Sequence, residues 1–395
     1  MIKRKKKNKE HNPFYDPTLK KRHLSAKRFK KFTLTSLIFS VAFLAFFLFD
    51  MIGKGIPAFN IAYIKVDVTF NEKTLEDTRF AVPTEYRNLV SRAALRDLPK
   101  LLEENPTYMN STQNIWILAS SQVDQYIKNH NHNLKDKDIA KVDELYAQGL
   151  IDKKFNAIFF ENGDSKIPEY AGIFSAVIGS ILTLIITMAV AFPIGVMTAI
   201  YLEEFALDNK FTRFIEININ NLAAIPSILF GLLGLAIFIN LFGMPRSSPL
   251  VGGLTLALMT LPIIIVSSRA ALRAVPDSIR QAGYGLGLNK IQVTKDHVLP
   301  LAFPGIMTGS IIGLAQAMGE TAPLIIIGMI AFIPDAPSMV TQAATVMPAQ
   351  LFTWAGMPEG MYIEKTAAGI LVLLTILISL NAIAIYFRKK LEVKW

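Results

Sequence analysis

The sequence of 395 residues contains no cysteine, so no disulfide can support any part of the chain. It also lacks the Gly-x-x-x-x-Gly-Lys-Ser/Thr loop that cradles nucleotide phosphates, and we therefore do not expect this chain to hydrolyse ATP. His130 and His132 lie in an Asn-rich turn and are predicted to be solvated loop side chains rather than metal ligands. No catalytic residue, metal site or resident cofactor is expected.

Charged residues are scarce, at 18% of the chain, whereas hydrophobic residues make up 52%. The charges are gathered into blocks that separate apolar runs long enough to cross about 30 Å of hydrocarbon. This pattern predicts an all-α polytopic membrane protein with six transmembrane helices. The expected spans are Phe32–Phe49, Gly172–Tyr201, Ile217–Phe242, Leu250–Ser268, Phe303–Ile330 and Thr366–Phe387.

The net charge of +10 comes from the first 31 residues, which hold thirteen Lys or Arg against Glu10 and Asp16. Because this block abuts a hydrophobic run, the positive-inside rule explains it better than binding to nucleic acid does. Residues 1–31 are therefore predicted to be a basic cytoplasmic tail, with possible contact to anionic lipid.

The six spans place residues 202–216, 269–302 and the end of the chain on one side of the membrane. Basic residues gather on that side, at Arg269, Arg273, Arg280, Lys290, Lys295 and 388–390, whereas the only basic residues of the short outside loops are Arg246 and Lys365. We expect a multi-pass protein of the bacterial cytoplasmic membrane with both termini in the cytoplasm, the last part being a tail at 391–395.

Residues 50–170, between the first two spans, have a different character. They contain fifteen Lys or Arg and eighteen Asp or Glu, together with an alternating stretch at 61–70 that is typical of a strand. Tyr86–Glu104 is predicted to be one amphipathic helix. We expect a small α+β insert outside the membrane.

A long polar segment, residues 269–302, separates the fourth and fifth spans. It carries a helical pattern, and a loop of this kind is expected to dock on another protein. Its spacing resembles the cytoplasmic coupling loop of ATP-binding-cassette importer permeases, in which Glu-Ala-Ala is followed by Gly and then Leu-Pro. The resemblance assigns coupling to an ATPase to Arg280, Gln281, Ala282, Gly283, Gly287, Leu299 and Pro300.

Three positions of this loop depart from the pattern: Gln281 replaces an acid, Gly283 an alanine and His297 an isoleucine. We expect Gly287 to lie at a tight turn or at a crowded contact with the ATPase. A bend at Leu299-Pro300 is expected where the chain re-enters the membrane.

Residues 171–390 resemble the permeases of the high-affinity phosphate importer, which belong to the MetI-like, type I binding-protein-dependent importers. The resemblance rests on Tyr201-Leu202-Glu203-Glu204, 225–232, 269–278 and 319–324. The basic tail, first span and insert are similar to a proteobacterial branch. The resemblance implies a second permease subunit, two ATPase subunits that bind ATP and Mg, and an extracytoplasmic phosphate-binding protein.

The spans contain no Lys or Arg well inside them, so hydroxyls, amides, helix N-termini or a partner must complement the anion. On the fifth span Gly305, Gly309 and Gly313 share a face with Gln316 and Glu320. We expect the glycines to serve helix packing and the intramembrane acid to serve function. The candidate pathway residues are Thr183, Thr187, Ser227, Gln316 and Glu320.

Several interpretations stay open. The threonine hydroxyls are as compatible with hydrogen bonds to their own helix as with a pathway lining. The imported anion could instead be phosphonate, sulfate or molybdate. A membrane-anchored sensor or adhesin would explain the insert but not the 269–302 loop, and a passive channel would transport without ATP.

Overall fold

The computed structural model describes residues 18–330 and 332–391, and the chain divides into two compact units, Met1–Gly53 and Lys54–Trp395. The first described helix, α1 (Leu19–Gly55), contains the predicted first span. Residues 32–49 of this helix contain no charged side chain, which suits a helix that crosses a membrane.

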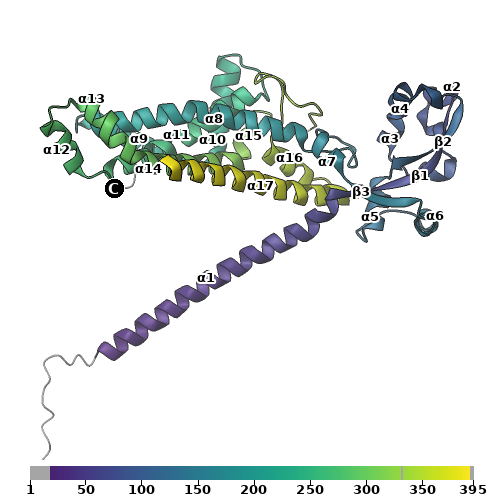
Figure 1. Ribbon diagram of the computed structural model, residues 1–395, viewed down its shortest axis with the longest axis horizontal. Coiled ribbons are helices and arrows are strands. Elements are labelled where there is room, and N and C mark those ends of the chain that lie inside the picture. Colours follow the sequence, from purple (N-terminus) through teal and green to yellow (C-terminus); the bar gives the residue numbers. More distant parts are fainter. Residues whose placement is uncertain (1–17, 331, 392–395) are drawn as a thin grey trace, which may run out of the picture. The chain divides into compact units, whose positions relative to one another are not determined.

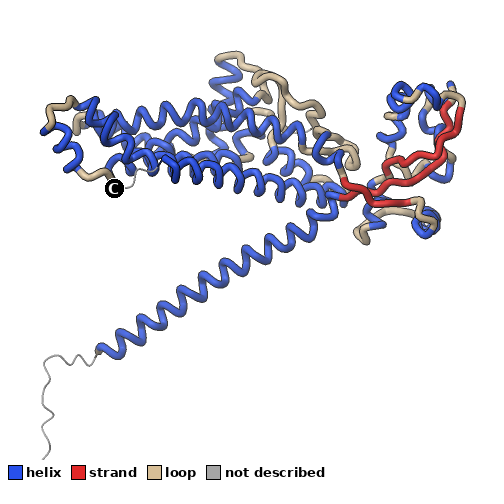
Figure 2. The backbone as a smooth tube through the Cα atoms, in the orientation of Figure 1, coloured by secondary structure: helices blue, strands red, loops and turns tan. Residues whose placement is uncertain are grey.

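A three-stranded antiparallel sheet organises the insert (Figure 1; Figure 2). Its strand order is β2-β1-β3, with β1 at Asn60–Phe70, β2 at Ser111–Leu118 and β3 at Ile151–Phe155. The predicted strand at 61–70 is confirmed. The side chains of Ile64, Val66 and Val68 on β1 are buried in the core of the insert.

Short helices surround this sheet. The predicted single helix Tyr86–Glu104 is wrong, because it is divided into α3 (Arg92–Arg96) and α4 (Leu98–Glu104). The Ser91 hydroxyl accepts a hydrogen bond from Ala93 N and starts α3, while Pro99 occupies the first turn of α4. The other elements are α2 (Glu72–Glu76), α5 (Ser121–Ile127), α6 (Asp136–Ala147), α7 (Ala157–Glu161) and the 3-10 turns Ile56–Phe59, Thr78–Ala81, Thr84–Tyr86 and Pro106–Tyr108.

Three further predicted spans are confirmed as long helices. These are α8 (Phe174–Ile200), α11 (Pro249–Arg273) and α17 (Gly360–Leu391). Small residues bring α8 and α11 close together, since a Cβ at Gly253 would lie 2.5 Å from Cβ of Ile186.

The third span is broken, and its prediction as one helix is wrong. Its first part belongs to an amphipathic helix, α9 (Lys210–Leu222), and its second part to α10 (Ser227–Gly234), which continues as a π-helix, η6 (Leu235–Leu241). The two parts are bent by 103° at the break. Pro226 lies at this break. A regular helix cannot continue through it, because proline lacks the N–H that a continuous helix requires.

The fifth span is also interrupted, which corrects the prediction of one helix over Phe303–Ile330. Helix α14 (Leu299–Gly319) ends immediately before Glu320, and a separate α15 (Ala322–Ile326) follows. In a continuous helix the ring of Pro323 would clash with the carbonyl of Gly319, four residues earlier. The described chain thus has five helices long enough to cross a membrane, or six if the bent α9–α10 pair counts as one span.

No bend lies at Leu299-Pro300, so that prediction is wrong. Lys290–Gly319 forms one helical run, made of α13 (Lys290–Gln292), the π-helix η7 (Val293–Val298) and α14. Pro300 falls in the first turn of α14, where its missing N–H is tolerated. After α15 the chain passes through α16 (Met347–Ala355) before α17 begins.

Side chains of the insert form hydrogen bonds with Glu364, which lies near the start of α17. Glu364 accepts hydrogen bonds from Gln125 (2.8 Å) and Lys128 (3.1 Å) and is also bonded to His130 Nδ1. His130 was predicted to be solvated, and this contact corrects that prediction. Because the insert and the membrane helices form one compact unit, its boundaries at 50 and 170 stay a prediction.

Candidate functional site

The predicted coupling segment, residues 269–302, contains a short helix with a defined end. Helix α12 (Asp277–Gly285) is followed by Gly287, whose φ of +82° lies in the left-handed region. Gly287 N donates to Tyr284 O (2.9 Å) and Leu288 N to Gly283 O (3.2 Å), which together form a Schellman motif. No heavy atom of the described chain lies within 4 Å of a Cβ built at Gly287. Within this chain Gly287 is therefore required by backbone conformation and not by crowding.

A buried ion pair fixes the base of α12. Arg280 Nη2 donates to Glu204 Oε1 (2.7 Å), and Glu204 is almost fully buried. The same guanidinium donates to the carbonyls of Leu272 (3.0 Å) and Val275 (2.8 Å), at the end of α11. Hydrogen bonding to Glu204 raises the pKa of Arg280 further, so its positive charge is permanent. Arg280 therefore joins α12 to the end of α11 and to η5 (Tyr201–Phe205), the π-helix that continues α8, and is not free to dock on a partner.

Two more arginines, Arg269 and Arg273 of α11, bind acids of η5 and α9. Arg269 Nη2 donates to Glu216 (2.5 Å), and both Arg269 (3.3 Å) and Arg273 (2.8 Å) donate to Glu203. These residues line a cleft of about 390 Å³. In the sequence alone, Glu203 and Glu204 contribute only to the family resemblance. The sequence does carry a signal for this pairing. Two adjacent acids follow the second apolar span, and two arginines four residues apart follow the fourth span.

The residues around the end of α12 form an exposed apolar surface. Leu286 is 80% exposed, and the apolar side chains of Tyr284 and Ile291 are exposed with it. Gln281 is also exposed and donates to Asp277 Oδ2 (2.8 Å) within its own helix.

The remaining predicted coupling residues take different positions. Ala282 is exposed beside Gln281, whereas Gly283 is buried and a Cβ there would lie 2.8 Å from Cγ2 of Val293. Leu299 and Pro300 are half-buried at the start of α14 and do not belong to the exposed surface.

Thr183 and Thr187 lie in the packed interface of α8 and α11. Thr183 donates to Gly179 O (2.8 Å), and Thr187 donates to Thr183 O (2.8 Å) and Gly253 O (3.2 Å). The cavity beside Thr183 measures about 10 Å³, room for no more than one water. The hydroxyls are thus used within the helices in this conformation, and a lining role for them stays a prediction.

Ser227, Gln316 and Glu320 lie at or near the two broken spans. Ser227 begins α10 directly after the bend, and Glu320 follows the last residue of α14. The helices that follow the two breaks, α10 and α15, pack closely against each other. A Cβ at Gly231 on α10 would lie 2.7 Å from Cα of Pro323 on α15. Within residues 18–330 and 332–391, neither the side chain of Gln316 nor that of Glu320 has a hydrogen-bond or ion-pair partner.

The glycines of α14 have the packing role predicted for them. A Cβ at Gly305 would lie 2.6 Å from Cβ of Ala271, and one at Gly309 would lie 1.9 Å from Ser267 Oγ. The small face of α14 is therefore filled by α11, and only its Gln316–Glu320 end carries unpaired polar groups.

Residues 191–393 match the family described as binding-protein-dependent transport system inner membrane component. The chain belongs to this family. It is accordingly a multi-pass inner-membrane protein, and the matched part contains the end of α8 together with the long apolar helices α11, α14 and α17. Residues 16–85 and 81–136 match a domain of unknown function, DUF3333, which covers much of the insert.

Several permeases are similar in sequence to this family member. The phosphate transport system permease protein PstA of Mycobacterium leprae is 36% identical over 160 residues, which are 40% of this chain and 52% of that protein. The PstA protein of Yersinia pestis is 30% identical over 244 residues, 61% of this chain and 80% of that protein. The probable ABC transporter permease YqgI of Bacillus subtilis is 34% identical over 168 residues, 42% and 56% respectively.

The chain spans about half the length of the M. leprae and B. subtilis relatives. Among solved structures, an inward-facing MetNI methionine ABC transporter aligns over 56% of this chain and 95% of that chain, with 14% identity and a TM-score of 0.43. The assignment to the family rests on the sequence matches.

Proposed function

We propose that this chain is a permease subunit of an ATP-driven importer of inorganic phosphate, with both termini in the cytoplasm. The proposal is supported by family membership and by the phosphate transport permeases among its relatives. Its expected partners are a second permease, two ATPase subunits that hold ATP and Mg, and a phosphate-binding protein outside. The chain itself contributes the membrane path and the coupling surface.

The exposed face of the coupling segment carries the proposal. Arg280 and Glu204 fix the base of α12, while Tyr284, Leu286 and Ile291 are left uncovered. A rigid base with an exposed apolar tip suits a surface that transmits movement from a docked ATPase to the membrane helices.

Glu320, Gln316 and Ser227 are proposed to belong to the phosphate path. Irregular backbone at membrane depth is tolerated where it is buried in protein or faces a water-filled cavity. The unpaired carboxylate of Glu320 beside such a break is expected to pair with a cation of the second permease or to accept a hydrogen bond from the protonated oxygen of hydrogen phosphate.

Substituting Leu286→Asp tests the coupling surface. The side chain is exposed, so a carboxylate there is tolerated by this chain but would be buried without a partner against an ATPase. We expect loss of ATPase co-purification from membranes, at unchanged amounts of the permease.

The matched control is Met339→Asp, which places the same charge on an exposed apolar position in the loop between α15 and α16. This variant is expected to retain the ATPase. If Leu286→Asp retains the ATPase as well as the control does, the coupling surface is misassigned and the sensor interpretation gains support.

A further inference from the structure

Strand β2 lies at the edge of the insert's sheet, and half of its backbone groups point away from the sheet. Ala119 N donates to Ala62 O (3.0 Å), on the side of β1, whereas Leu118 O accepts from Ser91 N (2.8 Å) on the opposite side. Because the direction of backbone groups alternates along a strand, Thr112, Asn114 and Trp116 point outward like Leu118.

These outward groups form an unused ladder. Within residues 18–330 and 332–391, the backbone N–H and C=O groups of Thr112, Asn114 and Trp116 have no partner on that side. Only the end of β2 is covered, by the bridge between Val90 and Ala119 and the bond from Ser91. An unpaired edge of this kind is a template for an added strand.

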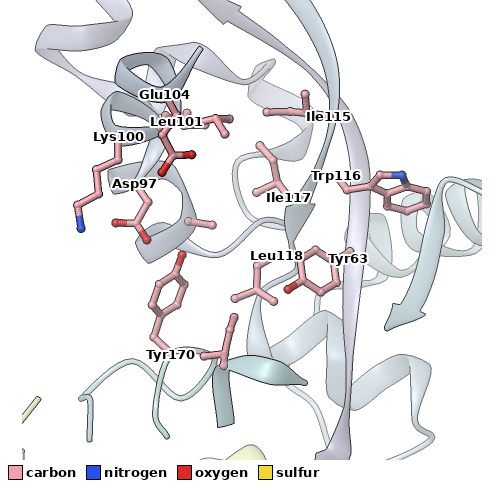
Figure 3. Close-up of a pocket in the computed structure, with 13 residues that line it drawn as sticks. Tyr63, Asp97, Lys100, Leu101, Glu104, Ile115, Trp116, Ile117, Leu118 and Tyr170 are labelled. Atoms are coloured by element: carbon pink, nitrogen blue, oxygen red, sulfur yellow. The ribbon is translucent and has the colours of Figure 1, made fainter. Parts of the chain in front are cut away.

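A cleft of about 360 Å³ runs beside this edge, between β2 and the segment α3–α4 (Figure 3). Leu101 lies on the helical side, and Ile115, Ile117 and Leu118 lie on the strand side. The lining thus provides apolar contacts for side chains that project from an added strand, as in grooves that bind peptides between a strand and a helix.

The helical wall of the cleft is acidic. Asp97 and Glu104 line it together with Lys100, whose side chain points away from the strand side in Figure 3. Tyr170 closes one end, and its hydroxyl points toward Asp97 in Figure 3. The acidic wall therefore favours a partner with a basic side chain beside its apolar ones.

We propose that this groove binds an extended segment of a partner protein, which adds to β2 as a fourth strand. The segment has alternating apolar side chains that enter the cleft and a Lys or Arg that faces Asp97 and Glu104. Its backbone pairs with Thr112, Asn114 and Trp116, and the covered end at Leu118 limits how far the pairing extends. This gives the insert, part of a domain of unknown function, a role in recognition.

A proline substitution separates this role from the stability of the sheet. Asn114→Pro removes an N–H that β1 does not use, and proline is tolerated at such an edge position. Asn114→Ala is the matched control, since it removes the same side chain but keeps the N–H. The full chain, its alanine control and its proline variant would each be screened in lipid nanodiscs against a phage-displayed library of random nonapeptides.

We expect peptides enriched on the native chain to alternate apolar residues and to carry Lys or Arg. They should bind Asn114→Ala as they bind the native chain, and Asn114→Pro about tenfold or more weakly. Bound peptide should slow amide exchange in 111–118. The double substitution Asp97→Lys with Glu104→Lys should change the preference from basic to acidic peptides.

Thermal melting of each variant in the same nanodiscs reports whether the insert is still folded. The proposal is overturned if no peptide is enriched on the native chain over the proline variant. It is also overturned if enriched peptides bind the folded proline variant as tightly as the alanine control, because backbone pairing with β2 would then play no part.

Discussion

At the residue scale, the side chain of Arg280 holds helix α12 in place. Its positive charge is compensated by Glu204, and its guanidinium also donates hydrogen bonds to two backbone carbonyls at the end of α11. Sequence spacing predicted that Arg280 belongs to the coupling segment. It could not supply the partner, because Glu204 lies 76 residues earlier and meets Arg280 only when α8 and α11 are packed.

Glu204→Gln tests this interpretation. The amide keeps the shape but leaves Arg280 uncompensated, and breaking a buried pair in this way costs about 3–5 kcal/mol. We expect a clear loss of thermal stability of the detergent-purified chain. In the exposed pair of Arg213 with Asp208, the control Asp208→Asn should change stability by less than about 1 kcal/mol. Equal effects of the two substitutions would show that the Glu204 pair has no special structural role.

Asp164 makes stability depend on pH. Its Oδ1 accepts from Trp354 Nε1 and its Oδ2 from Phe332 N, both at 2.8 Å. Burial raises the pKa of Asp164 above its ordinary value of 3.8 despite these bonds. A raised carboxyl pKa means that the folded state retains the proton longer than the unfolded state does. The resulting contribution to stability is present below the ordinary pKa and is lost as the pH rises through the folded-state pKa.

Asp164→Asn cannot titrate and should therefore remove this part of the pH dependence. The measurement compares thermal unfolding of the native chain and the variant at pH values from about 4 upward, where the ordinary carboxyl begins to ionise. We expect the difference in stability between them to shift in favour of the variant as the pH rises. Parallel curves would mean that ionisation of Asp164 does not differ between the folded and unfolded states.

At the scale of elements, the two broken spans were the main feature that hydropathy could not predict. Apolar composition continues through Pro226 and through Glu320, so both segments were predicted as single helices. The prolines at 226 and 323 were visible, but a proline can also kink a membrane helix without ending it. The packing of α10 against α15 fixes both breaks, and this contact joins residues about ninety apart in sequence.

Substituting Glu320→Gln tests the functional meaning of the second break. The amide preserves shape but cannot compensate a partner cation, so phosphate uptake by the assembled transporter should fall severely, while the amount of protein in the membrane stays unchanged. Gln316→Ala, on the neighbouring exposed turn, should have a milder effect. Native uptake rate and apparent affinity in Glu320→Gln would assign Glu320 to helix packing.

At the scale of the whole molecule, four long helices, the first strand of the insert and the helical character of residues 277–285 could all be predicted from local patterns. Apolar runs, alternation and the Gln281–Gly287 spacing are each contained in a single stretch of sequence. The links between stretches could not be predicted, as His130 shows by its contact with Glu364, 234 residues later. Long-range polar contacts depend on the packed fold and leave no periodic signal.

ATP-driven uptake of radiolabelled phosphate is the most direct test of the proposed function. The chain would be reconstituted in vesicles with its second permease, ATPase subunits and external phosphate-binding protein. We predict that uptake requires ATP and is reduced by excess unlabelled phosphate but not by sulfate, molybdate or phosphonate. Uptake that continues without ATP would indicate a passive channel, and inhibition by another oxyanion as strong as that by phosphate would contradict the assignment of the substrate.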